Sequence, residues 1–308
     1  IVLNSWWAGA LRLASRKAKD ETDVRQAAGL LEAWTSIIGN ILLFGVKFTI
    51  GTAIRSISLV ADSFHTLSDV LTSVVVLAGF KISGRAPDRE HPFGHGRGES
   101  IATLVIAILL AVVGVEFTSQ SVRRLLHPAP VAGTLLIAGI MVVSGVLKEL
   151  MASFSIWLGR RIDSSTLIAD AWHHRSDAIA SVLVAAAIVG AIFKIYWLDG
   201  MLGIGVSLLI LWTGFDLGRA ATNSLLGRSP DERVITCIQE EAATVSGVVG
   251  VHDVSVHEYG PHLAISLHVE VERTLDVSQA HLIADEVERR IAVRMNAQAV
   301  VHVDPLEG

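Results

Sequence analysis

The first 217 residues of this 308-residue sequence are dominated by six apolar runs of about 20 residues each. A helix needs about 20 mostly apolar residues to cross the hydrocarbon core of a bilayer. The sequence therefore predicts six membrane-spanning helices. The second and fifth carry ionisable residues in their first halves, so a strict hydropathy criterion could miss them. The six expected spans are approximately residues 31–51, 57–82, 100–121, 132–158, 167–193 and 197–217.

Composition separates this membrane part from a soluble tail. Residues 1–227 carry 19 basic and 16 acidic side chains, a net charge of +3, whereas residues 228–308 carry 6 basic and 14 acidic ones, a net charge of −8. Only 18% of all residues are charged, against about 25% in an average soluble domain. The overall net charge of −5 argues against a nucleic-acid-binding protein, and the single cysteine, Cys237, cannot form an internal disulfide.

Basic residues in the loops predict the orientation in the membrane. Six spans place both termini on one side, and the loops on that side carry more Lys and Arg than the opposite loops. The positive-inside rule makes that side cytoplasmic. We expect a cytoplasmic N-terminal segment at 1–30, a transmembrane domain at 31–220 and a cytoplasmic domain at 228–308, in a multi-pass protein of the cell membrane. The basic residues on this side include Arg12, Arg16, Lys17, Lys19, Arg25, Arg85, Arg89, Arg97, Arg160 and Arg161.

The tail changes to the pattern of a small α+β domain. A helix over 230–246 is predicted to begin with Ser229 as its N-cap and Pro230 at its first position. The segment after it alternates between apolar and polar residues, as a strand with one buried face does. The order helix, strand, strand, helix, strand predicts a ferredoxin-like fold. The later elements are expected at 248–258, 263–272, 277–296 and 299–303.

One internal repeat contains the main candidate metal ligands. Residues 61–69 read ADSFHTLSD and residues 169–177 read ADAWHHRSD, and both lie inside predicted spans. Positions i and i+4 of a helix share a face, so His65 lies beside Asp69 and His173 beside Asp177. Two such helices facing each other present two imidazoles and two carboxylates to one point. This ligand set suits zinc and is acceptable to other divalent first-row metals.

A purely structural role for the repeat is the alternative, and its energetic cost argues against it. An aspartate near the bilayer centre costs ~2.5–3.5 kcal/mol even on a lenient scale, so the four aspartates of the two repeats would cost ~10–14 kcal/mol. Structural zinc sites in small peptides contribute ~10–16 kcal/mol, enough for a bound metal to offset most of this cost. The other intramembrane charges lie near span ends or could pair, and for most of them we expect snorkelling or packing; they are Glu116, Lys148, Glu149 and Asp216. Lys47 and Trp34 are expected to anchor the interface.

Two further groups of residues are candidate metal ligands. In the loop PDREHPFGHGRGES, residues 87–100, Asp88, His91 and His95 are spaced for a site, although a loop with two histidines is more often a solvated surface than a ligand set. The tail holds six of the twelve histidines. Taken singly, each of them is better explained as a solvated surface residue than as a ligand. As a set in an acidic domain, metal binding and a solvated surface are about equally good explanations.

These residues resemble the cation diffusion facilitator family of metal/proton exchangers over roughly residues 31–308. The resemblance is carried by the two His-x-x-x-Asp pairs, the loop HPFGHGRGES, and the tail segments VHD (251–253), QAHLIADEVE (279–288) and HVDP (302–305). It implies six transmembrane helices, a cytoplasmic ferredoxin-like domain, a homodimer, and a transport site at the repeat. It also implies metal binding at Asp88, His91 and His95 in the loop and at a tail site formed by His252, His268, His281, His302 and Asp304.

The resemblance also bears on the metal. Two His and two Asp is the pattern of zinc-preferring members, whereas manganese-type members typically have Asp or Asn in place of the histidines. We therefore expect zinc as the transported and regulatory ion, with iron, cobalt, nickel or cadmium as alternatives and no prosthetic group. The expected partners are divalent metal ions, protons, membrane lipid and a second copy of the chain. The short connection at 159–166, without a long His-rich loop, indicates a bacterial-type protein.

Two other classes of protein place metal ligands in a membrane. An intramembrane metallohydrolase needs an open coordination position and a general base, usually on an HExxH helix, and this sequence has no HExxH. A metal sensor that transports nothing has the same ligands, and only a flux measurement separates it from a transporter. For the transporter we expect proton exchange at His65 and His173, because metal binding requires deprotonated ligands.

Overall fold

The computed structural model describes residues 2–16, 21–53, 57–127, 134–193, 195, 197–227, 231–260, 262–295 and 297–306. The chain divides into two compact units. One unit comprises residues 1–84 and 98–222, and the other comprises residues 85–97 and 223–308. The loop at 85–97 therefore belongs with the C-terminal residues rather than with the helices that flank it in the sequence.

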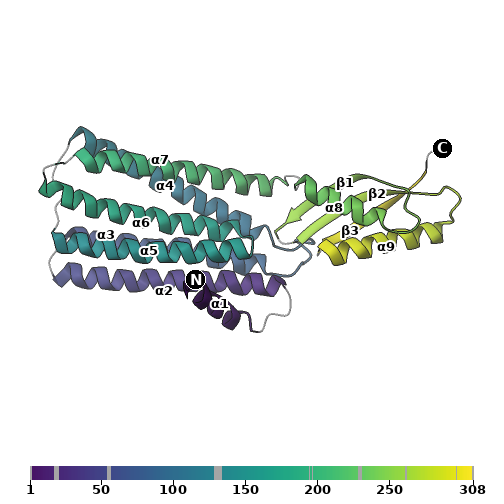
Figure 1. The fold of residues 1–308 in the computed structure, drawn as a ribbon, viewed down its shortest axis with the longest axis horizontal. Coiled ribbons are helices and arrows are strands. Elements are labelled where there is room, and N and C mark those ends of the chain that lie inside the picture. Colours follow the sequence, from purple (N-terminus) through teal and green to yellow (C-terminus); the bar gives the residue numbers. More distant parts are fainter. Residues whose placement is uncertain are drawn as a thin grey trace. The chain divides into compact units, whose positions relative to one another are not determined.

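The first unit is a bundle of long helices that run side by side (Figure 1). Five of the described helices are long and apolar enough to cross a membrane. Among the described residues, α6 is not one of these five; it has 28 residues, and its first half carries Asp170, Arg175 and Asp177. The second predicted span is one of the five. The helices of this unit are α1 (Val2–Ala14), α2 (Glu21–Ala53), α3 (Ile57–Ser83), α4 (Gly98–Leu126), α5 (Leu135–Arg161), α6 (Ser165–Ile192) and α7 (Trp197–Leu225).

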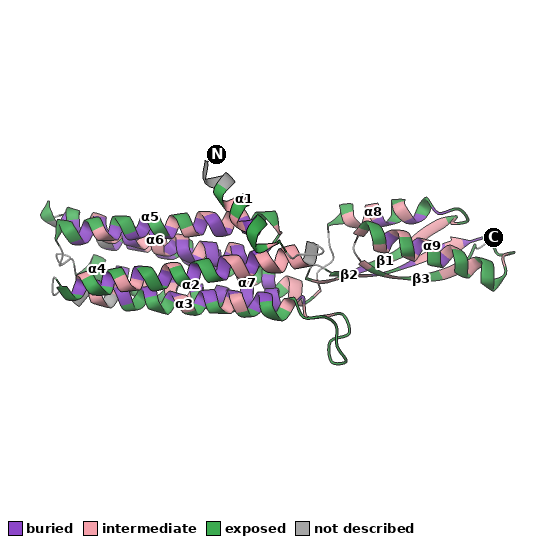
Figure 2. Ribbon diagram, turned by 90° about the horizontal axis from the view of Figure 1, so that it is seen from below, coloured by how far each residue is buried: buried purple, intermediate pink, exposed green. Residues whose placement is uncertain are grey.

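Apolar side chains both fill the bundle and cover its outside. Phe80, Ile106, Leu158 and Leu167 form part of its buried core. Figure 2 shows buried positions alternating with exposed ones along each long helix. Many exposed positions are large and apolar, such as Leu71 at 66% exposure, and in water such a surface would be unfavourable. A helix bundle with an apolar outside is what a bilayer stabilises.

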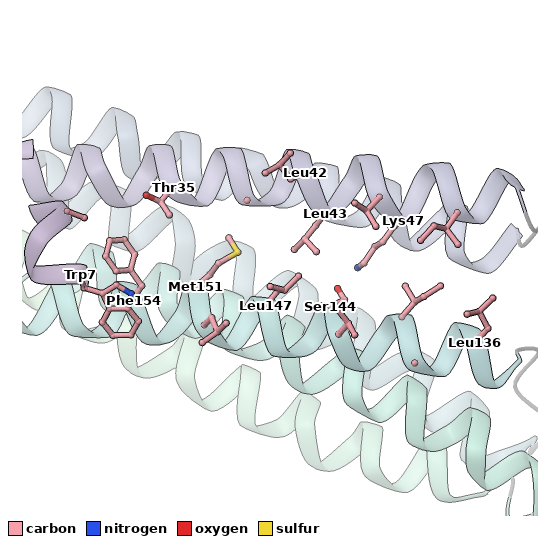
Figure 3. A pocket seen from close by; sticks show the side chains of 18 of the residues that line it. Trp7, Thr35, Leu42, Leu43, Lys47, Leu136, Ser144, Leu147, Met151 and Phe154 are labelled. Carbon is pink, nitrogen blue, oxygen red and sulfur yellow. The ribbon is translucent and has the colours of Figure 1, made fainter. Parts of the chain in front are cut away.

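An apolar groove of about 880 Å³ lies between α2 and α5. Figure 3 shows Lys47 of α2 pointing from one wall of this groove toward Ser144 of α5 on the other. The expectation that Lys47 anchors the membrane interface is wrong: its side chain is 3% exposed, and its Nζ lies 2.8 Å from Asp62 Oδ2. Because α2 packs along α3, a carboxylate is within reach of this ammonium inside the bundle.

The second unit is the predicted α+β domain. Its three-stranded sheet has the order β1-β2-β3, with β1 antiparallel to β2 and β2 parallel to β3. The predicted alternation of β2 is confirmed, because Ile265, Leu267, Val269 and Val271 are all buried in a core to which both helices contribute. The elements are α8 (Glu232–Ala243), β1 (Gly250–Tyr259), β2 (His262–Val271), α9 (Val277–Met295) and β3 (Ala297–Pro305).

The start of α8 differs from the prediction. Its N-cap is Asp231, whose side chain accepts a hydrogen bond from the backbone N–H of Arg233. The expected cap, Ser229, and Pro230 lie outside the described residues. Asp231 satisfies one of the free N–H groups of the first turn and places a negative charge at the positive end of the helix dipole.

The loop 85–97 packs on this domain. The ring of Phe93 stacks on Tyr259, with centroids 4.8 Å apart, and Arg97 Nε donates a hydrogen bond to the backbone carbonyl of Glu258. The guanidinium of Arg97 also lies 4.3 Å from the centroid of the Tyr259 ring. These contacts hold the loop and its candidate ligands against the end of β1.

The core of the α+β domain predicts a stability effect. Leu267 is fully buried between the sheet and the helices. Leu267→Ala is expected to lower the free energy of unfolding of the domain by about 2–5 kcal/mol, because it removes buried methyl groups and leaves a cavity. Val300→Ala, at a 59% exposed position of β3, is the control and should change this free energy by less than about 1 kcal/mol. Chemical denaturation measures both, and equal effects would contradict the burial.

Candidate metal centres

The repeat brings four side chains together between two helices. His65 and Asp69 come from α3, and His173 and Asp177 from α6. His173 Nε2 lies 3.6 Å from Asp69 Oδ1 and 3.7 Å from Asp177 Oδ2. One ligating atom each of His65, Asp69 and Asp177 lies within 4.8 Å of the others. His65, Asp69 and Asp177 also line a cavity of about 60 Å³. We call these four residues the membrane cluster.

Lys148 lies in the middle of this cluster. Its Nζ donates hydrogen bonds to Asp69 Oδ2 at 2.7 Å and to Asp177 Oδ2 at 2.9 Å, and its side chain is 2% exposed. Lys148 is thus paired inside the bundle and does not snorkel. Since α5 packs along α6, its ammonium group reaches the two carboxylates, which need a counter-charge when buried in the membrane. Glu149, the next residue, is paired with Arg175 of α6.

The first aspartates of the two repeats lie in different surroundings. Asp62 is paired with Lys47, as described above. Asp170 is fully buried, and its Oδ2 lies 3.1 Å from Nε2 of His174. Glu32 of α2 completes a group with these two residues, in which one ligating atom of each lies within 4.8 Å of the others. We call Glu32, Asp170 and His174 the inner acidic cluster; the sequence analysis missed it, although Glu32 is an ionisable residue inside a predicted span.

The loop residues also come together. Asp88 Oδ2 lies 3.4 Å from His95 Nε2, and Asp88 Oδ1 lies 3.5 Å from His91 Nδ1. Asp88 Oδ1 accepts hydrogen bonds from the backbone N–H of His91 at 2.7 Å and of Glu90 at 2.9 Å. These bonds, that from His91 above all, lower the pKa of the Asp88 carboxyl below its ordinary value. The loop therefore offers an ionised carboxylate and two imidazoles within reach of one ion.

Three tail histidines form a row across the sheet. His252 of β1, His268 of β2 and His302 of β3 are register partners. Asp304 lies beside all three: its Oδ2 is 2.8 Å from His268 Nδ1 and 3.4 Å from His252 Nε2, and its Oδ1 is 3.3 Å from His302 Nε2. The hydrogen bond with His268 lowers the pKa of Asp304. A register shift just after His252, where Asp253 has a φ of 49°, interrupts the β1–β2 ladder beside this row.

His281 does not join this row. It lies on α9, its side chain is 71% exposed, and its Nε2 is 3.6 Å from Asp285 Oδ2 on the same helix. Because α9 packs against the core face of the sheet while the row lies on the other face, one chain cannot bring His281 to Asp304. His281 is expected in the tail site only from the family resemblance, since it has no strand position that would place it beside the other histidines.

Comparisons with known proteins agree with this architecture. The family described as the cation efflux transmembrane domain matches residues 33–226, and the cation efflux cytoplasmic domain matches residues 230–306. An uncharacterized transporter of Methanocaldococcus jannaschii is 38% identical over 270 residues, which cover 87% of this chain and 95% of the relative.

Two further relatives carry functional names. The manganese efflux system protein MneS of Bacillus subtilis is 29% identical, covering 89% of this chain and 95% of the relative. The cation-efflux pump FieF of Cronobacter sakazakii is also 29% identical, covering 81% of this chain and 84% of the relative. The chain thus belongs to the cation efflux, or cation diffusion facilitator, family, and is a multi-pass membrane transporter of divalent cations, not an enzyme, with a cytoplasmic C-terminal domain.

Proposed function

We propose that this protein exports zinc from the cytoplasm in exchange for protons, with the membrane cluster as the transport site. The observation that carries the proposal is the grouping of His65, Asp69 and Asp177 within reach of one ion, with the His173 imidazole 3.6 and 3.7 Å from the two carboxylates. Zinc prefers four nitrogen and oxygen ligands in a tetrahedral arrangement, and two His and two Asp supply such a set. The manganese named for one relative makes manganese the metal that a selectivity test has to include.

Charge balance indicates how the site is loaded. Asp69 and Asp177 carry two negative charges when ionised, and the ammonium of Lys148 supplies one positive charge between them. A divalent cation that binds the same two carboxylates would lie close to this ammonium and would be repelled by it, so the two cations compete for the site. Lys148 thereby acts as a tethered cation that competes with the metal and compensates the empty site.

Proton exchange follows from the ligand chemistry. Metal binding requires neutral imidazoles and ionised carboxylates, so a proton that enters the site weakens metal binding and a metal ion that enters expels protons. A pH-sensitive dye trapped in proteoliposomes should therefore report proton movement opposite to zinc movement. Zinc transport that continues unchanged after both the pH gradient and the membrane potential have been collapsed would exclude proton coupling.

For the C-terminal domain we propose regulation by metal in a homodimer. The description of the matching family as a cytoplasmic domain of cation efflux proteins supports the location, and the row of His252, His268 and His302 beside Asp304 supplies ligands. The loop group of Asp88, His91 and His95 is proposed as a further cytoplasmic binding site, packed on the same domain. We propose that metal binding at the tail row brings the two C-terminal domains of the dimer together and activates transport.

Asp304→Asn tests the tail row. It removes the charge shared by three histidines, so we expect metal affinity at the row to fall by about 10-fold or more. Transport at low cytoplasmic metal should fall, whereas transport at saturating metal should remain. Glu240→Gln, which removes an exposed carboxylate of α8, is the matched control. Zinc flux measured over a range of zinc concentrations gives the result, and an unaltered response in Asp304→Asn would contradict a regulatory role.

A further inference from the structure

Two buried carboxylates of the membrane unit differ from the others in their partners. Asp69 and Asp177 are paired with Lys148, Asp62 with Lys47, and Glu99 with Arg25, each at 2.9 Å or less. Within the described part of the chain, Glu32 and Asp170 have neither a lysine nor an arginine in an ion pair. Both are 0% exposed.

The polar contacts around the inner acidic cluster leave ligand atoms free. Ser36 Oγ and Ser155 Oγ donate hydrogen bonds to Glu32 Oε1. Among the described residues, no hydrogen-bond partner exists for Glu32 Oε2 or Asp170 Oδ1, and Asp170 Oδ2 has only the His174 imidazole beside it. An unpaired carboxylate in a dry interior is costly, and in a membrane the cost cannot be relieved by water. A positive charge at the point where these oxygens meet would offset this cost.

Histidine completes a ligand set there. His174 is 0% exposed, and its Nε2 lies 3.1 Å from Asp170 Oδ2 and 3.0 Å from Ser36 Oγ. Two carboxylates and one imidazole are ligands of zinc and related divalent cations, and Ser36 and Ser155 are suited to orient them. A divalent ion would neutralise the two carboxylates.

The inner acidic cluster adjoins the membrane cluster. His173 and His174 are consecutive on α6, about 100° apart around the helix, and their ring centroids are 5.9 Å apart. His173 points to Asp69 on α3, whereas His174 points to Ser36 on α2. Asp170 lies one turn closer to the start of α6, which follows the short loop after α5 that the positive-inside rule places in the cytoplasm.

A polar stripe on α2 connects the two clusters. Glu32, Ser36 and Asn40 follow one another at intervals of four residues, and Lys47 lies two turns further on nearly the same face. All four are at most 3% exposed. Both polar side-chain atoms of Asn40 are buried, and the described residues provide neither with a hydrogen-bond partner. Lys47 lines the same cavity as His65 and Asp69.

We infer that Glu32, Asp170 and His174 form a second intramembrane site for a divalent cation, on the cytoplasmic side of the transport site. Cation binding there does not depend on the proposed function, whereas a role in handing the ion to the membrane cluster rests on it. The ion would be held by two carboxylates and an imidazole and would then pass along the stripe on α2 to His65 and Asp69.

The test counts zinc ions bound by the purified full-length protein and locates them. Glu32→Gln keeps the size and the hydrogen bonds to the serines but removes one charge, so it should lower the bound zinc by one ion per chain. Glu116→Gln, at an exposed carboxylate of α4, should bind as many ions as the unmodified chain. Asp177→Asn should lose a different ion, and the double variant Glu32→Gln/Asp177→Asn should lose two.

A crystal of the unmodified protein soaked in zinc provides a measurement that does not depend on the folding of a variant. Anomalous scattering at the zinc edge should show one peak among Glu32, Asp170 and His174 and another in the membrane cluster. A peak in the membrane cluster without one at the inner acidic cluster, together with unchanged stoichiometry in Glu32→Gln, would overturn the inference and leave the proposed function standing. A peak at the inner acidic cluster alone would support the inference and contradict the membrane cluster as the transport site.

Discussion

Asp177→Asn is expected to abolish zinc transport. The substitution keeps the size of the side chain but removes a carboxylate that both contacts His173 and pairs with Lys148. Loss of a group that only orients a metal ligand costs about 10–100-fold in affinity or activity, and loss of a ligand should cost more. Zinc flux into proteoliposomes under an imposed pH gradient should therefore fall to the level of protein-free vesicles. Asp69→Asn should give the same result, because Asp69 has the same two neighbours.

The control for this prediction is Asp216→Asn. Asp216 is an exposed carboxylate of α7, so the substitution makes the same change of charge in the membrane domain away from the cluster. Its flux should match that of the unmodified protein. Flux retained in Asp177→Asn at more than about a tenth of the unmodified rate would exclude this residue from the transport site.

Lys148→Met should destabilise the metal-free protein and tighten metal binding. Removing one partner of a buried ion pair costs about 3–5 kcal/mol, because the other partner stays buried without its counter-charge, and here two carboxylates lose the same ammonium. A divalent cation replaces the missing charge without having to displace the lysine. We expect a lower melting temperature without metal, a larger rise in melting temperature on addition of zinc, and slower release of the ion.

Lys81→Met separates this effect from the loss of any lysine. Lys81 lies exposed in the last turn of α3, and its replacement should leave both melting temperatures unchanged. Thermal unfolding with and without zinc, together with equilibrium zinc binding, measures both variants. A Lys148→Met protein as stable without metal as the unmodified one, with the same zinc affinity, would mean that Lys148 does not compensate the empty site.

The sequence predicted the two halves of the membrane cluster because helical periodicity defines each of them. An i, i+4 spacing fixes His65 beside Asp69 and His173 beside Asp177 without knowledge of the neighbouring helices. The role of Lys148 could not be predicted in the same way, since it depends on which helix packs beside α6 and at what height. For the same reason, Lys47 was expected at the interface and instead pairs with Asp62 across two helices.

The inner acidic cluster shows that equivalent positions of a sequence repeat can have different surroundings. Asp62 and Asp170 occupy the same position in the two repeats, yet one has a lysine as its partner and the other has Glu32 and His174. In the tail, strand alternation correctly puts His268 on the face opposite the core, and register then adds His252 and His302. His281 is kept away from these histidines because α9 packs on the core face of the sheet. That packing is a tertiary feature, which the local sequence pattern does not specify.

The most direct test of the central claim is the metal selectivity of the unmodified protein. Uptake into proteoliposomes with an imposed pH gradient would be compared for zinc, cadmium, iron and manganese at equal free concentrations. Two imidazoles and two carboxylates in a small buried site should favour zinc and cadmium, and we predict zinc flux at least about 10-fold above that of manganese. Manganese or iron transported in preference to zinc would contradict the assignment of zinc to His65, Asp69, His173 and Asp177.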